Sequence, residues 1–65
     1  MNIRAEIRTV EDYVKDQTDS KAKRVEIISR AQGMVTGDER VLAVLAIAKR
    51  RIIAEYIKTL HNTKG

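Results

Sequence analysis

The sequence contains no cysteine, proline, phenylalanine or tryptophan, and only three of its 65 residues are glycine. Without cysteine, neither a disulfide nor a thiolate metal site can form. Without proline, and with so few glycines, little interrupts a helix. No segment alternates apolar and polar residues as a half-buried strand does. The sequence therefore predicts an all-α chain with an aliphatic core.

Catalytic motifs are missing as well. His61 is the single histidine, and neither Ser20 nor Ser29 lies in a G-x-S-x-G context. Nothing matches H-E-x-x-H, and the pair Gly33 and Gly37 is followed by acidic residues where a phosphate-binding loop needs a lysine. We therefore expect a non-enzymatic protein with no metal, no cofactor and no small-molecule substrate.

Three helices are predicted within a single domain of residues 1–65. Their approximate ranges are 2–16, 20–32 and 37–61, followed by a mobile tail at 62–65.

Capping residues give the expected boundaries of these helices. Ser20 belongs to a polar break that favours the start of the second helix. Gly33 is the expected left-handed residue at its end. Thr36 and Glu39 have the spacing of a capping box for the third helix.

The first two helices carry apolar residues at spacings of three and four. In the first helix these form one narrow stripe: Ile3, Ile7, Val10 and Val14. In the second helix they form a broader one: Ala22, Val25, Ile27, Ile28, Ala31 and Met34. A narrow stripe suits docking against a single neighbouring helix.

The third helix is the most apolar segment and carries two adjacent stripes. At about 100° per residue, the first stripe contains Val41, Leu45, Ala48, Ile52 and Tyr56. The second stripe contains Leu42, Ala46, Ile53, Ile57 and Leu60. Ala43, Val44 and Ile47 lie on the far side, so we expect the first half of this helix to be buried nearly all round, with Lys49 interrupting its apolar face.

Such a face needs more cover than two short helices provide. A chain of this length lies near the lower limit for folding alone, and oligomerisation is the stabilising device that remains without disulfides or metal. We therefore predict a homodimeric helical bundle in which the second stripe faces a second copy. The predicted core and dimer residues are Val41, Leu42, Leu45, Ala46, Ile52, Ile53, Tyr56, Ile57 and Leu60.

The net charge of +4 permits contact with nucleic acid, acidic protein or anionic lipid. Residues 1–19 are net acidic, whereas the rest of the chain is net basic, which could steer the first helix onto the other two. The candidate contact residues for a partner or for nucleic acid are Lys21, Lys23, Arg24, Arg30, Arg50, Arg51 and Lys58.

Neither a membrane span nor a classical DNA-reading helix is expected. The apolar run 41–48 is much shorter than the roughly 20 residues needed to cross a bilayer. The same run opens the helix after Gly33, so that helix cannot serve as the polar recognition helix of a helix-turn-helix. The N-terminal residues lack the apolar core of a secretory signal, and together with the missing cysteines this favours the cytoplasm.

Two functions remain. The first is a small regulatory or adaptor protein that acts by binding another protein; the size and composition are typical of accessory regulators of phages, plasmids and bacteria. The alternative is a small basic DNA-associated protein, a transcriptional regulator or cofactor, that contacts phosphates through the second helix and the run 49–51.

Overall fold

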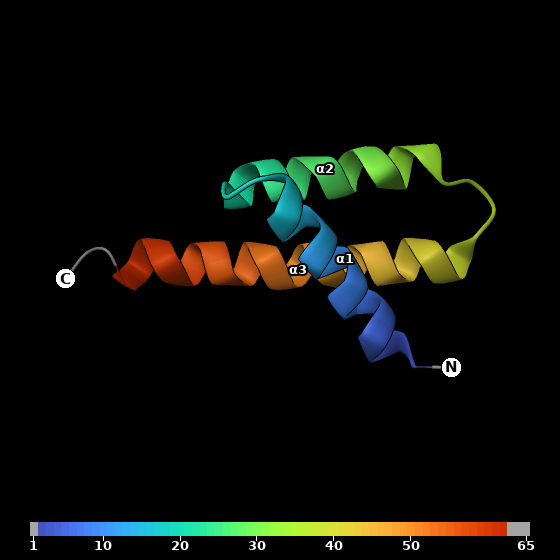
Figure 1. Ribbon diagram of the computed structural model, residues 1–65, viewed down its shortest axis with the longest axis horizontal. Coiled ribbons are helices and arrows are strands. Elements are labelled where there is room, and N and C mark those ends of the chain that lie inside the picture. The colour runs from blue at the N-terminus through green and yellow to red at the C-terminus, as the bar shows by residue number, and fades with distance from the viewer. Residues whose placement is uncertain (1, 63–65) are drawn as a thin grey trace.

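The computed structural model describes residues 2–62. Within this range the chain forms three helices and no strand, which confirms the all-α prediction. They are α1 (Ile3–Gln17), α2 (Lys21–Met34) and α3 (Glu39–Asn62). Figure 1 shows α2 and α3 side by side and antiparallel, with α1 crossing them obliquely.

Side chains cap the start of each helix. Asn2 accepts a hydrogen bond from the backbone N–H of Arg4, and Ser20 accepts one from the N–H of Lys23. At α3 the cap is Asp38, whose Oδ1 accepts from the N–H of Val41 at 3.1 Å. Each bond satisfies a backbone donor that the first turn of a helix leaves without a partner. The predicted capping box from Thr36 is therefore wrong, because the helix begins two residues later.

The left-handed residue between α2 and α3 is Gly37, with φ of 80°, and not Gly33. Gly33 lies inside α2, which continues until the N–H of Val35 bonds the carbonyl of Ala31 and the backbone becomes extended. At its other end α3 runs through Asn62, one residue further than expected. The rest of the predicted tail, 63–65, lies outside the described residues.

The core lies where the three helices meet. It consists of aliphatic side chains from every helix: Ile7, Val14, Ile28, Val44, Leu45, Ala48 and Ile52. Ala48 is fully buried, and its small side chain allows close approach of the neighbouring helices. No described side chain buries an unsatisfied polar atom. The core therefore satisfies the rule that buried groups are apolar or hydrogen-bonded.

The predicted stripes of the two short helices contribute only their middle residues to this core. Ile7 and Val14 are buried in α1, and Ile28 is buried in α2. At the ends, Ile3 is exposed and Met34 is 81% exposed. The stripes are longer than the contacts, because α1 crosses the other helices obliquely and meets them over its middle turns (Figure 1).

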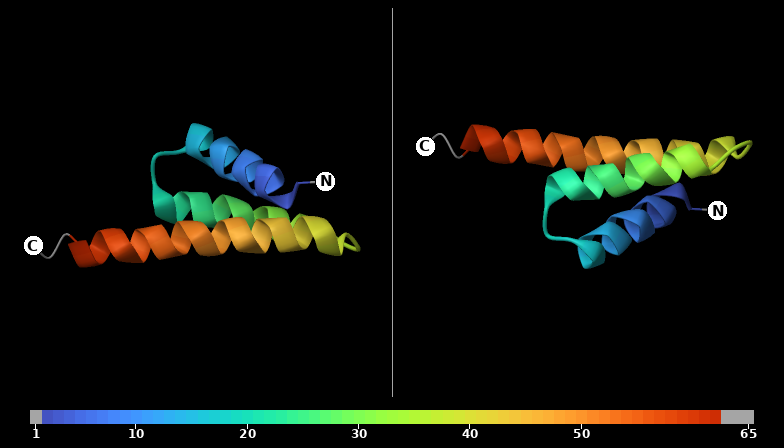
Figure 2. Two further views of the ribbon diagram at one scale, coloured as in Figure 1. Left: turned by 90° about the horizontal axis from the view of Figure 1, so that it is seen from below. Right: turned by 90° about the horizontal axis from the view of Figure 1, so that it is seen from above.

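The helix α3 is longer than the surface that covers it. With a rise of about 1.5 Å per residue, its 24 residues span about 36 Å, against about 21 Å for the 14 residues of α2. Figure 2 shows the C-terminal turns of α3 extending past the start of α2, and shows α1 on one side of the layer formed by α2 and α3. The projecting end and the opposite side of that layer are left uncovered.

Among the described residues, no helix is both long enough and apolar enough to cross a membrane.

Candidate functional site

The two apolar stripes predicted for α3 have different environments. From the first stripe, Leu45, Ala48 and Ile52 are buried in the core, while Val41 and Tyr56 at its two ends are partly exposed. The predicted core and dimer residues therefore separate into an internal set and an external set.

The external set lies along one side of α3, and we name it the α3 stripe: Leu42, Ala46, Ile53, Ile57 and Leu60. These residues fall within about 60° of one another around the helix, and their centre lies about 130° from the centre of the buried residues. Leu42 is half-buried, and the others are exposed, with values of 36% at Ile53, 48% at Ile57 and 55% at Leu60.

The expectation that the first half of α3 is buried nearly all round is wrong for a single copy. Ala43, Ala46 and Ile47 are exposed, whereas Val44 is buried. The reason is geometric: the core residues contributed by α3 occupy one side of it, so α1 and α2 leave the other side uncovered. Helical periodicity identified the apolar positions but not which of them the chain itself covers.

Lys49 was expected to interrupt the apolar face. In the structure its Nζ lies 3.4 Å from Oε1 of Gln32 on α2. The ammonium group is thus directed toward α2, at the edge of the α3 stripe. The four-carbon stem of such a side chain can cover apolar surface while the charge stays hydrated.

Two charged contacts join α1 to α3. Nε of Arg51 donates to Glu11 at 2.8 Å, and Arg40 pairs with Glu6. They agree with the expectation that an acidic first helix docks onto a basic remainder. Ion pairs at the surface contribute roughly 0.2–1 kcal/mol each, so these two add little to the stability that the apolar contacts of α1 provide.

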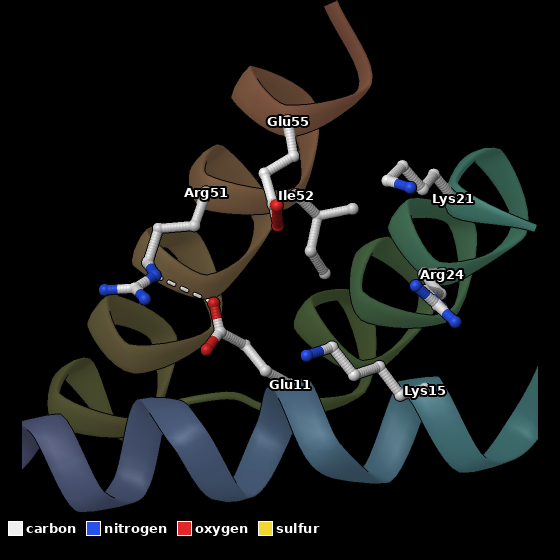
Figure 3. Close-up of a pocket in the computed structure, with 7 residues that line it drawn as sticks. All are labelled: Glu11, Lys15, Lys21, Arg24, Arg51, Ile52 and Glu55. Carbon is white, nitrogen blue, oxygen red and sulfur yellow. Dashed lines mark hydrogen bonds and ion pairs between the residues drawn. The ribbon is translucent and has the colours of Figure 1, made fainter. Parts of the chain in front are cut away.

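A small charged pocket lies between the three helices next to the Glu11–Arg51 pair (Figure 3). Its lining residues are Glu11, Lys15, Lys21, Arg24, Arg51, Ile52 and Glu55. Nε of Arg24 donates to the carbonyl of Thr18 at 2.8 Å. Cations outnumber carboxylates in this lining, so the pocket favours an anion, and it has no side chain suited to act as a nucleophile.

The seven basic candidates do not form one surface. Lys21, Arg24 and Arg51 line the charged pocket, with Glu11 and Glu55 among them. The other four lie outside this pocket. Lys23 and Arg30 border a separate hollow that also contains Glu26, and the Arg30 guanidinium lies 3.7 Å from the Glu26 carboxylate. Arg50 and Lys58 are exposed on α3.

An apolar groove between α1, α2 and α3 was not predicted. It is lined by Thr9, Val10, Tyr13, Val14, Ile27, Ile28, Ala31 and Leu45. Tyr13 is 57% exposed at its edge. The sequence did contain a signal, since Tyr13 flanks the apolar stripe of α1, but only the oblique crossing angle opens a space beside it.

Among the described residues, no cluster of histidine, aspartate or glutamate has the arrangement of a metal site. The external features of residues 2–62 thus include an apolar helix face, an apolar groove and a mixed charged pocket.

No family model matches the chain, and neither a curated protein nor a solved structure shows significant similarity to it.

Proposed function

We propose that the protein is a small non-enzymatic regulator or adaptor that acts by binding other proteins, and that it forms a homodimer through α3. One observation carries this proposal. The C-terminal half of α3 presents Ile53, Tyr56, Ile57 and Leu60, each 36–55% exposed, on a helix that extends past the rest of the bundle.

Four large side chains of α3 are only partly covered within one copy. Complete burial of one such side chain contributes about 1.5–3 kcal/mol. Covering the exposed part of these four therefore contributes roughly 3–5 kcal/mol per copy, and about twice that in a two-fold dimer. This gain is of the same order as the cost of association, about 4–15 kcal/mol. Dimer affinity should then depend strongly on each of these four side chains.

A two-fold dimer suits a regulator. Each copy presents its apolar groove and its charged pocket once, so the dimer presents each of them twice. Two identical sites at a fixed distance favour a dimeric or repeating partner, because the second contact is then intramolecular. Helical faces and grooves of this kind are used by many protein-binding modules.

The test uses a charge placed on the stripe and a matched control. Ile57→Glu places a carboxylate in the proposed interface, where burial of an unpaired charge is costly. Lys58→Glu places the same group about 100° away on the helix, with a larger change in net charge. We expect Ile57→Glu to be a folded monomer and Lys58→Glu to remain a dimer, as measured by light scattering coupled to size exclusion and by circular dichroism. A folded dimer of the Ile57→Glu variant would refute the interface.

The second candidate function is DNA contact through basic side chains. The observation in its favour is the gathering of Lys21, Arg24 and Arg51 around one pocket, beside Lys15. It has less support than protein binding, because Glu11 and Glu55 lie among these cations and phosphate neutralisation requires a face of one sign.

A further inference from the structure

The uncovered side of α3 has the spacing of a coiled-coil seam. Ala43, Ala46, Arg50, Ile53, Ile57 and Leu60 follow one another at intervals of three, four, three, four and three residues. These are the a and d positions of a heptad pattern. All six are exposed. We name them the pairing seam.

We propose that the pairing seams of two copies pack antiparallel, with Ala43 opposite Leu60, Ala46 opposite Ile57 and Arg50 opposite Ile53 of the second copy. This inference rests on the proposed dimer and specifies its geometry. Each of these pairs joins an a position to a d position. The two-fold axis passes between residues 51 and 52, so every contact occurs twice.

Side-chain size favours this arrangement. The seam is narrow at its N-terminal end, where it has two alanines, and wide at its C-terminal end, where it has Ile57 and Leu60. An antiparallel pair places the small residues of one copy against the large residues of the other, which gives an even helix separation and close packing. A parallel pair would put alanine against alanine at one end and leucine against leucine at the other.

Charge gives a smaller preference in the same direction. In a parallel pair Arg50 would face Arg50 of the second copy in the same layer, without an acidic residue on the seam to compensate. In the antiparallel pair each guanidinium faces Ile53, and the two Arg50 positions are offset by about 4.5 Å along the axis, which reduces their repulsion without removing it.

The extent of cover distinguishes this register from its nearest alternatives. Shifted by one heptad in one direction, an antiparallel pair would place Ile53 against Ile57 and leave Ala43 and Ala46 uncovered. Shifted in the other direction, it would place Ala43 against Ile53 and leave Ile57 and Leu60 uncovered. The proposed register instead covers the whole exposed seam, including the apolar surface near the N-terminal end of α3.

Because the chain has no cysteine, single cysteines report the register without background. We would prepare the variants Ala46→Cys and Ile57→Cys, with a mass tag on one of them. Each variant alone, and a refolded mixture of the two, would be treated with a mild oxidant and with a short thiol-bridging reagent. In the proposed register the two positions adjoin across the dimer. Identical positions are about 16 Å apart along the axis, too far for a disulfide. We expect the cross-linked heterodimer only in the mixture.

Two results would overturn the register. Cross-linking of each variant with itself would show a parallel pair. Cross-linking of an Ile53→Cys and Ile57→Cys mixture, with none for Ala46→Cys and Ile57→Cys, would show a shifted register. In both cases a dimeric mass for the unmodified chain would still agree with the proposed function. A monomeric mass would contradict both the antiparallel register and the proposed homodimer.

Discussion

A pair of alanine substitutions separates the core of one copy from the proposed interface between copies. Ile28 is 1% exposed at the centre of the helix contacts, and Ile57 is 48% exposed on the α3 stripe. Ile28→Ala removes buried methyl groups and leaves a cavity, at a cost of about 2–5 kcal/mol. In a domain of this size each kcal/mol lowers the melting temperature by roughly 4–8 °C. We therefore expect a decrease of at least about 8 °C.

Ile57→Ala should act by a different route. Within one copy the position is exposed, so the free energy of unfolding should change by no more than about 0.5 kcal/mol. Between copies, the lost burial is about half of a side chain worth about 1.5–3 kcal/mol, and it is lost twice per dimer. The expected result is a dimer dissociation constant raised roughly tenfold to a hundredfold.

The assay is urea unfolding followed by far-ultraviolet circular dichroism at two protein concentrations a hundredfold apart. Association with the folded state makes stability depend on concentration. We expect Ile28→Ala to lower stability at both concentrations and Ile57→Ala to lower it mainly at the higher one. Equal losses for the two variants at the lower concentration would refute the division of α3 into an internal and an external side.

Two further predictions concern the α2–α3 connection and the basic side chains. Gly33→Ala should raise the free energy of unfolding by about 0.5–1 kcal/mol, because alanine favours a helix interior and the site is open. Gly37→Ala should lower it by about 1 kcal/mol, because the site has a φ of 80°. A lower melting temperature for Gly33→Ala or a higher one for Gly37→Ala would contradict the assigned turn. For DNA, the four basic candidates of α2 are replaced by glutamate: Lys21, Lys23, Arg24 and Arg30. We expect anisotropy to show weak duplex binding by the native chain that disappears at physiological salt, and sequence-selective binding that survives this salt and is lost in the variant would instead support the DNA-binding candidate.

Apolar residues recur at spacings of three and four along the sequence, and this periodicity located the three helices. Ser20 is recognisable as a cap because its hydroxyl oxygen can accept a hydrogen bond from a backbone N–H of the first turn, as it does from Lys23. The end of α2 was placed at the wrong glycine, since both Gly33 and Gly37 permit a left-handed backbone. The choice between them depends on where the chain must turn to bring α3 alongside α2.

The sequence could not predict which apolar side chains of α3 are buried by α1 and α2. The stripes containing Leu45 and Ile53 are both apolar, yet Leu45, Ala48 and Ile52 are buried while Ile53, Ile57 and Leu60 are exposed. That difference depends on crossing angles between helices, which arise from the packing of many side chains at once. The apolar groove beside Tyr13 and the charged pocket beside Arg51 were missed for the same reason.

The central claim is that the α3 stripe is covered by another polypeptide, and first of all by a second copy. Sedimentation equilibrium of the unmodified chain over a wide concentration range tests it most directly, because a single chain has a mass of 7.4 kDa. We predict a reversible approach to twice that mass as the concentration rises. A mass that stays at one copy throughout would contradict the account.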